Sequence, residues 1–141
     1  ELKQAAVDTA AALGISDKVI FDNFRQDVPA VLQGIDIYCL PSLWEGFPIG
    51  VLEAMAMGKT VVATDVDGTR EAVTHEENGW LIPPKNTAAL AGAIAKMAAD
   101  EPLRAKLSQA AIQMVQEKYN VSGMTRRIEN VYTSLFSDKV Q

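Results

Sequence analysis

The chain has 141 residues, the size of one domain, and 48% of them are hydrophobic, enough to form a continuous core. Its 18 acidic and 13 basic residues give a formal net charge of −5, which argues against a nucleic-acid-binding protein. The single cysteine, Cys39, excludes an internal disulfide or a zinc cluster built on cysteines. Because the chain begins at Glu1 with no leader, we interpret its start as the edge of a fragment.

The first residues predict a helix, a strand and a second helix. Residues 2–13 are rich in alanine and favour a helix, which Gly14 ends in the position of a left-handed cap. Residues 19–21 are expected to form the first strand of a sheet. Residues 28–32 then predict a short helix, and Asp27 is placed to cap its start.

The central residues predict a strand, a helix and a strand that pair in parallel. Residues 35–40 form the first of these strands and are too apolar for the edge of a sheet. Residues 50–57 form the helix, which Gly58 closes, and residues 60–64 form the next strand. A hairpin cannot accommodate an intervening helix, so the two strands are expected to be parallel, with a right-handed crossover.

The remaining pattern is mainly helical. A short helix at 69–73 precedes a brief strand at 79–82, which two prolines stop. Three helices are expected at 87–99, 102–119 and 122–136, the last with an apolar stripe along one side. The predicted fold class is therefore α/β, a Rossmann-like parallel sheet with helices on both faces, followed by C-terminal helices.

The loop at residues 41–49 is the expected place for a ligand, because open parallel sheets bind ligands beyond the carboxyl ends of their strands. Gly46 and Gly50 allow the backbone to approach a ligand closely. The unpaired amides at the start of the following helix favour an anion such as phosphate, and they belong to Phe47, Ile49 and Gly50. Glycines before a helix also occur only because tight turns need them.

Two carboxylates flank this helix start. Glu45 lies in the loop, and Glu53 lies in the first turn of the helix, three residues after Gly50. A diphosphate would not favour two carboxylates unless each accepted hydrogen bonds from hydroxyl groups, and hydroxyl-rich groups on both sides of a phosphate describe a nucleotide sugar. Alternatively, Glu53 only favours the positive end of the helix and Glu45 is solvated.

The stretch from Pro41 to Gly58 reads PSLWEGFPIGVLEAMAMG. It resembles the Glu-x7-Glu region of the family 4, or group 1, retaining glycosyltransferases. Further matches lie upstream and downstream of it, at residues 17–21, 36–40, 61–64, 68–71 and 77–84. The resemblance covers nearly the whole chain, from about residue 14 to residue 136.

The resemblance implies an enzyme of the GT-B fold with two Rossmann-like domains. Residues 1–141 would be the single donor-binding domain, incomplete at its N-terminus, and the helix 122–137 would pack toward an absent N-terminal domain or, alternatively, on its own domain. The implied reaction transfers a hexose from a nucleoside-diphosphate sugar to an acceptor hydroxyl, with retention of anomeric configuration, in polysaccharide biosynthesis. We expect the isolated chain to be inactive.

The resemblance also implies roles for individual residues. Glu45 would be the catalytic residue, facing the donor sugar near the reacting carbon, and Glu53 would hold the ribose hydroxyls. The diphosphate or sugar would lie against a donor-binding segment in which Pro48 lacks an amide hydrogen and stiffens the loop, namely Gly46, Phe47, Pro48, Ile49 and Gly50. The main chain of Phe24 and Arg25 would border the nucleobase.

The sequence departs from the family pattern in two places and lacks a cation in a third. Asn23 and Asp67 stand where the family commonly has glycine. Asp67 either selects among sugars or caps the following helix, and we favour the cap. No Lys or Arg lies between Pro41 and Gly58, although a leaving diphosphate needs cationic or dipolar stabilisation.

The resemblance implies no cofactor and no metal site, since no Asp-x-Asp cluster precedes the expected pocket. The expected partners are a nucleotide sugar and a carbohydrate or lipid-linked acceptor on the absent domain, without nucleic acid. We expect a cytoplasmic location, or one at the inner face of the membrane through the absent domain, because no membrane association is visible in these residues.

Two other functions share this fold. One is a non-catalytic module that binds a nucleotide sugar, suggested by Asn23, Asp67 and the missing cations. The other is a different GT-B enzyme, such as a nucleotide-sugar epimerase, which would normally add basic and histidine residues.

Overall fold

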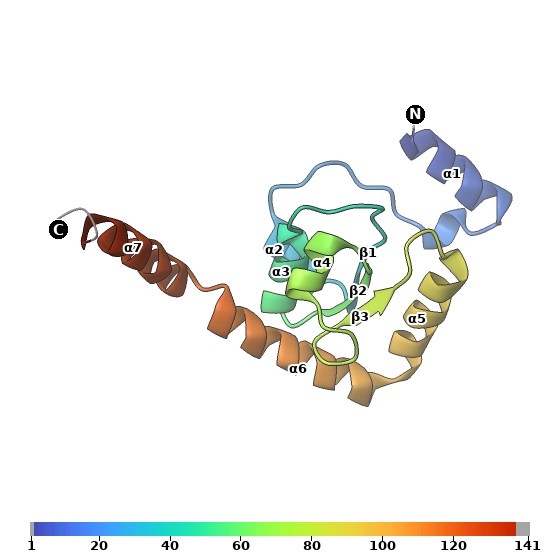
Figure 1. Cartoon of the computed structure of the whole chain (residues 1–141). Coiled ribbons are helices and arrows are strands. Elements are labelled where there is room, and N and C mark those ends of the chain that lie inside the picture. Colours follow the sequence, from blue (N-terminus) through green and yellow to red (C-terminus); the bar gives the residue numbers. More distant parts are fainter. Residues whose placement is uncertain (1, 138–141) are drawn as a thin grey trace.

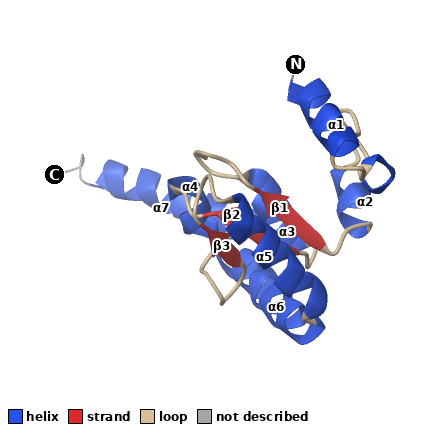
Figure 2. Ribbon diagram, turned by 90° about the vertical axis from the view of Figure 1, so that its right-hand side faces the viewer, coloured by secondary structure: helices blue, strands red, loops and turns tan. Residues whose placement is uncertain are grey.

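The computed structural model describes residues 2–137 and shows a small parallel sheet surrounded by helices (Figures 1 and 2). The strands lie in the order β1 (Ile37–Leu40), β2 (Thr60–Thr64) and β3 (Trp80–Ile82). All pairs are parallel, with Ile37 opposite Thr60 and Val62 opposite Trp80. Parallel pairing confirms the strand, helix and strand unit predicted for the centre of the chain.

Helices make up most of the described chain, and each lies close to its predicted position. Their bounds are α1 (Leu2–Ala12), α2 (Val28–Gln33), α3 (Ile49–Ala56), α4 (Asp67–Ala72), α5 (Thr87–Ala99), α6 (Glu101–Lys118) and α7 (Val121–Ser137), with a 3-10 turn at Ser16–Lys18. Gly14, at the end of α1, has a φ of 67°, as expected of a left-handed cap.

The core has two layers, one on each face of β2, and every residue of β2 is buried. Val61 and Ala63 face α3, α4 and α6, where they pack with Val51 and Met55. Val62 faces the opposite way, into a cluster that includes Met97 of α5. This alternation follows from the two-residue period of a strand and confirms a sheet covered by helices on both faces.

The strand predicted at residues 19–21 is wrong. Val19 has an extended backbone, but the segment pairs with no strand of the described sheet, and Ile20 is 93% exposed. So short a segment forms a strand only where a neighbour completes its hydrogen bonds and covers its apolar side chains. Without that neighbour, β1 lies at the edge of the described sheet with Cys39 exposed, contrary to the prediction of an interior strand.

The cap predicted at Asp27 is also wrong. Asp27 precedes α2, but its carboxylate makes no capping hydrogen bond and instead binds the guanidinium of Arg25. A bidentate, charge-assisted pair is stronger than a single bond to a helix amide, which explains the preference. Later helices do have side-chain caps, because Asn86 accepts from the amide of Ala89 and Asp100 from that of Leu103, both at 2.9 Å.

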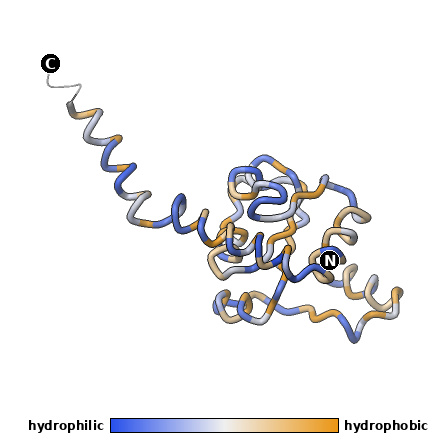
Figure 3. The backbone as a smooth tube through the Cα atoms, turned by 90° about the horizontal axis from the view of Figure 1, so that it is seen from below, coloured by the Kyte–Doolittle hydropathy of each residue, from blue (hydrophilic) through white to orange (hydrophobic). Residues whose placement is uncertain are grey.

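The last helix extends away from the rest of the molecule (Figures 1 and 3). Its large apolar side chains are between 49% and 73% exposed, and they are Val121, Met124, Ile128, Val131, Tyr132, Leu135 and Phe136. The alternative that α7 packs on its own domain is therefore wrong for the described residues.

Candidate functional site

Two loops meet at the carboxyl edge of the sheet, the one between β1 and α3 and the one between β2 and α4. The amide of Gly68, in the first turn of α4, donates to the carbonyl of Glu45 at 3.2 Å. A Cβ atom at Gly68 would lie 2.6 Å from that carbonyl oxygen, closer than real Cβ contacts allow. Only glycine allows α4 to pack directly against the loop that carries Glu45.

Glu45 is half-buried and its side chain is held in place. The hydroxyl of Ser42 donates to Glu45 Oε1 at 2.6 Å, and the hydroxyl of Thr64 donates to the carbonyl of Ser42 at 2.5 Å. Thr64 ends β2 and is buried. The glutamate is thereby connected to the central strand through two hydrogen bonds, which keeps Glu45 Oε2 available to a ligand.

Glu53 lies on α3 and is exposed, and Tyr38 of β1 is half-buried. Burial raises the pKa of the Tyr38 hydroxyl, and the negative charges of Glu53 and then Glu45 raise it further. Glu45 stands before the start of α3 at Ile49 and Glu53 stands after it, and their action on one ligand stays a prediction.

The start of α3 leaves backbone amides without a partner in the helix. The helix begins at Ile49, and the carbonyl of Pro48 accepts from the amides of Val51 and Leu52 at 3.0 and 3.4 Å. The amides of Ile49 and Gly50 come before these first helical bonds, so they have no partner within the helix. Gly50 is required here, because a Cβ atom would lie 2.6 Å from the hydroxyl of Tyr38.

The residues around this helix start fix the course of the loop. Pro48 is buried and has an extended backbone, with φ −81° and ψ 92°. The ring of Phe47 packs against Tyr119, at the end of α6, with ring centroids 5.6 Å apart. Tyr119 in turn donates to the carbonyl of Glu71 in α4 at 2.9 Å. Gly46, by contrast, is exposed, and a Cβ atom added there would meet nothing within 4 Å.

The loop after residue 21 reaches the other side of Tyr38. Arg25 and Tyr38 line the same hollow of about 280 Å³, between this loop, α2 and β1. Arg25 binds Asp27 and Asp22, and the pKa of Arg25 is raised mainly by its hydrogen bonds to Asp27. Phe24 does not line the hollow, and its side chain is 90% exposed. Of these two residues only Arg25 lines the hollow, and the prediction that their main chain borders a base stays a prediction.

A second hollow, of about 240 Å³, contains Glu45. One wall comes from the loop of Glu45, with the exposed ring of Trp44, and the other comes from α4 and the residues before it, with Arg70. The guanidinium of Arg70 binds Asp65 at 2.5 Å and lowers the pKa of that carboxyl group. Arg70 is a cation that lies outside residues 41–58, where the sequence has no Lys or Arg.

Asp67 belongs to this hollow and is not a cap, so the favoured prediction for it is wrong. The cap position of α4 is Val66, and Asp67 is the first residue of the helix, with no capping hydrogen bond. Its carboxylate lies 3.4 Å from the guanidinium of Arg70 and is fully exposed. Once inside the helix, the side chain points away from the amides that a cap must reach.

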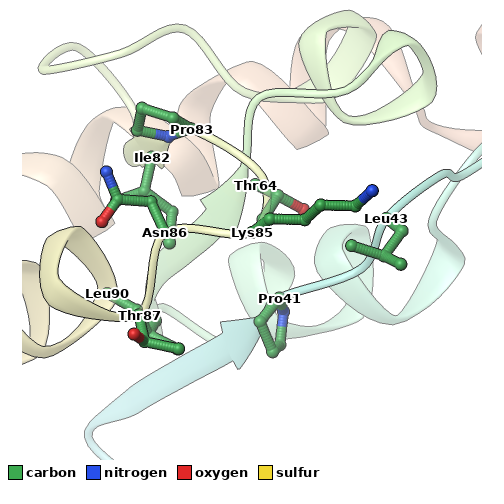
Figure 4. A pocket seen from close by; sticks show the side chains of 9 residues that line it. All are labelled: Pro41, Leu43, Thr64, Ile82, Pro83, Lys85, Asn86, Thr87 and Leu90. Atoms are coloured by element: carbon green, nitrogen blue, oxygen red, sulfur yellow. The ribbon is translucent and has the colours of Figure 1, made fainter.

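A third hollow at the same edge of the sheet is small and apolar (Figure 4). Its volume is about 110 Å³, and it lies between Pro41 and the start of α5, with Lys85 extending across it toward Leu43. Lys85 has a φ of 59°, which is unusual for a residue other than glycine. The hollow has less than half the volume of the one beside Glu45 and its lining is apolar, so it does not fit a sugar.

Within residues 2–137, no group of three or more His, Cys, Asp or Glu side chains is arranged to hold a metal ion. In the same part of the chain, no helix is both long enough and apolar enough to cross a membrane.

Sequence reasoning missed four residues that shape the site, namely Tyr38, Ser42, Thr64 and Arg70. Three of them lie on β1, β2 or the loop after β1, so their places at the carboxyl edge follow from the strand pattern. Arg70 could have been found from the rule that the loops of neighbouring parallel strands converge, because it lies one turn into the helix after β2.

Comparison with known proteins assigns this chain to a family. The family model described as glycosyl transferases group 1 matches residues 1–114. The lipopolysaccharide core biosynthesis mannosyltransferase of Rhizobium meliloti is 33% identical over 130 residues, which are 91% of this chain and 37% of that protein. An α-1,3-N-acetylgalactosaminyltransferase of Campylobacter jejuni that acts on a diphospho-undecaprenol is 42% identical over 89 residues, 63% of this chain and 24% of that protein.

Solved structures share the fold. The C-terminal domain of a glycosyl transferase group 1 family protein from Francisella tularensis has a TM-score of 0.79 at 29% identity, and the match covers 85% of this chain and 63% of that one. HepE of Anabaena, in complex with UDP and glucose, has a TM-score of 0.88 at 28% identity, over 93% of this chain and 36% of that one.

The chain spans well under half the length of the two curated relatives, 37% and 24%. The matched region nevertheless includes every strand of the described sheet and both loops of the site. The chain belongs to the glycosyl transferases group 1 family, and its fold is the Rossmann-like C-terminal domain of the GT-B architecture.

Proposed function

We propose that this chain is the donor-binding domain of a retaining glycosyltransferase, which moves a hexose from a nucleoside-diphosphate sugar to an acceptor hydroxyl. The observation that carries the proposal is the half-buried Glu45, held by Ser42 in the loop just before α3, with the exposed Glu53 within that helix. The complexes of HepE with UDP and with UDP-glucose support it, because that protein has the same fold at 28% identity.

Each part of the site has a chemical role in this proposal. The amides of Ile49 and Gly50 and the positive end of α3 receive the diphosphate. Glu53 accepts hydrogen bonds from the ribose hydroxyls, and Arg25 borders the base. Glu45 faces the reacting carbon of the sugar, where its fixed carboxylate stabilises the positive charge that develops as the diphosphate leaves.

The rest of the enzyme lies outside this domain in our proposal. The acceptor, a carbohydrate or a lipid-linked saccharide, binds to a second domain, and the exposed apolar face of α7 packs against that domain. The short coverage of the relatives supports such an arrangement. We expect no transfer by the isolated chain, because the acceptor site and further cationic groups for the diphosphate belong to parts of the enzyme other than these residues. We also propose metal-independent chemistry in the cytoplasm or at the inner face of the membrane.

Calorimetric titration of the complete enzyme with UDP, GDP and ADP tests the donor site. One of these nucleotides is expected to bind. Replacement Glu53→Gln removes hydrogen bonds to a charged group, which are worth about 1.5–3 kcal/mol, and should weaken binding roughly tenfold to a hundredfold. Glu77→Gln, in an exposed turn remote from the site, is the control and should bind as the parent does.

Glu45→Gln separates catalysis from binding. The variant should bind the nucleotide with nearly unchanged affinity but lose transfer by about two to three orders of magnitude, because it removes charge stabilisation at the reacting carbon. If none of the three nucleotides binds the parent enzyme, the proposal fails. If one nucleotide binds but no transfer to any acceptor or to water is detected, the protein is a non-catalytic binding module instead.

A further inference from the structure

The hollow beside Glu45 carries an excess of carboxylates. Its charged lining consists of Glu45, Asp65 and Asp67 against the single guanidinium of Arg70. Two of these carboxylates share that guanidinium, Asp65 at 2.5 Å and Asp67 at 3.4 Å. Three negative charges and one positive charge leave a net charge of −2 on the walls of the hollow.

Each carboxylate has one oxygen engaged and one free within the described residues. Glu45 Oε1 accepts from Ser42, and the Oδ1 atoms of Asp65 and Asp67 accept from Arg70. The other oxygen of each group has no protein donor in the described part of the chain. The residues that line the hollow therefore carry three carboxylate oxygens without a protein donor, which can accept from the hydroxyl groups of a sugar.

Of these three carboxylates, Asp67 is the one that does not hold another part of the hollow in place. Ser42 and Thr64 hold Glu45, and Arg70 also donates to the backbone carbonyl of Asp65 at 3.3 Å. Asp67 has a weaker contact, is fully exposed and caps nothing. Asp67 therefore contributes only its negative charge, on the wall of the hollow opposite the loop of Glu45.

We propose that Asp67 determines donor specificity, by favouring an uncharged sugar with free hydroxyl groups and disfavouring a sugar that carries a carboxylate. This inference rests on the proposed function, because it assumes that the transferred sugar occupies the hollow of Glu45. An uncharged hexose supplies hydroxyl donors to the free oxygens, whereas a uronic acid brings a further negative charge to walls that already carry −2.

Matched donors that differ only at one carbon provide the test. UDP-glucose and UDP-glucuronic acid share the nucleotide and the ring, and differ by a hydroxymethyl group against a carboxylate. If GDP is the nucleotide that binds, GDP-mannose and GDP-mannuronic acid replace them. The measurement is the ratio of dissociation constants for the two donors in the complete enzyme, obtained by competition against the bound nucleotide.

The parent enzyme should prefer the uncharged donor. Asp67→Asn keeps the shape of the side chain and removes its charge, and it should lower this preference about fivefold, the size expected for one exposed pair of charges. Arg70→Gln removes the positive charge and should change the ratio in the opposite direction, raising the preference. Asp36→Asn, at the amino end of β1, is the matched control and should leave the ratio unchanged.

The affinity for the nucleotide alone distinguishes the possible failures. If it is retained in all variants and the ratio stays unchanged in Asp67→Asn, the inference about Asp67 is wrong while the donor site stands. If the parent binds no nucleotide, the proposed function itself fails. If Asp67→Asn loses nucleotide affinity as well, a role in general binding or folding replaces the role in specificity.

Discussion

At the residue scale, the contact between Gly50 and Tyr38 explains why the residue at position 50, at the start of α3, is glycine. The tyrosine hydroxyl occupies the space that a side chain at position 50 would need, 2.6 Å from an ideal Cβ. The next atom of the ring, Cζ, would be 3.6 Å away, an ordinary van der Waals distance. The conflict therefore involves a single oxygen atom.

We predict that Gly50→Ala lowers the free energy of unfolding by about 1–3 kcal/mol, the usual cost of overpacking. In a protein that already carries Tyr38→Phe, the same change should be neutral or slightly stabilising, because the oxygen is gone and alanine favours a helix by about 1 kcal/mol. Denaturant unfolding of the four proteins measures this coupling. Equal costs of Gly50→Ala in both backgrounds would show that the hydroxyl is not the obstacle.

At the element scale, α4 holds the loop of Glu45 through Gly68. Its amide donates to the carbonyl of Glu45, and its missing side chain allows the backbones to touch. Gly68 thus links the loop after β1 with the helix after β2, and these two strands are neighbours in the sheet. The contact sets the position of Glu45 relative to Arg70, across the hollow.

Gly68→Ala should displace the loop, because the obstacle is backbone that cannot rotate away. We expect a loss of at least about 1–3 kcal/mol of stability, together with a fall in transfer rate at temperatures where the variant is fully folded. Gly92→Ala, in α5, is the matched control, since a Cβ atom there meets nothing within 4 Å. That change should stabilise the protein by about 0.5–1 kcal/mol and leave the transfer rate unchanged. Unaltered transfer in folded Gly68→Ala would contradict this account.

The elements also show what the sequence could predict. Helices with a clear apolar period and end signals were placed well, and α5 has the predicted bounds. The strand at residues 19–21 was wrong because an apolar tripeptide becomes a strand only through a partner, which a local pattern does not specify. Asp27 and Asp67 were assigned as caps from their position, but each carboxylate instead pairs with an arginine a few residues away.

The candidate site could be predicted from the sequence only where its residues lie close together along the chain. Glu45, Glu53 and the glycines lie in one loop and one helix, so their proximity follows from the chain itself. Tyr38, Thr64 and Arg70 come from separate elements, and their contacts depend on strand order and register. The segment of Phe24 and Arg25 was the hardest to place, and only Arg25 reaches the hollow beside Tyr38.

At the scale of the whole molecule, function depends on two loops that neighbouring parallel strands bring to one edge. The buried β2 strand connects both, since Thr64 contacts the first loop and continues into the second. The apolar face of α7 extends away from this edge and remains exposed. We therefore expect these two loops to supply ribose and diphosphate contacts, while further phosphate-binding groups and the acceptor site belong to parts of the enzyme other than these residues.

A crystal structure of the complete enzyme with its nucleoside diphosphate tests this account most directly. We predict diphosphate oxygens within hydrogen-bonding distance of the amides of Ile49 and Gly50, ribose hydroxyls at Glu53, and an open space beside Glu45 that leads to Arg70. A diphosphate bound elsewhere, with both glutamates remote from it, would contradict the account.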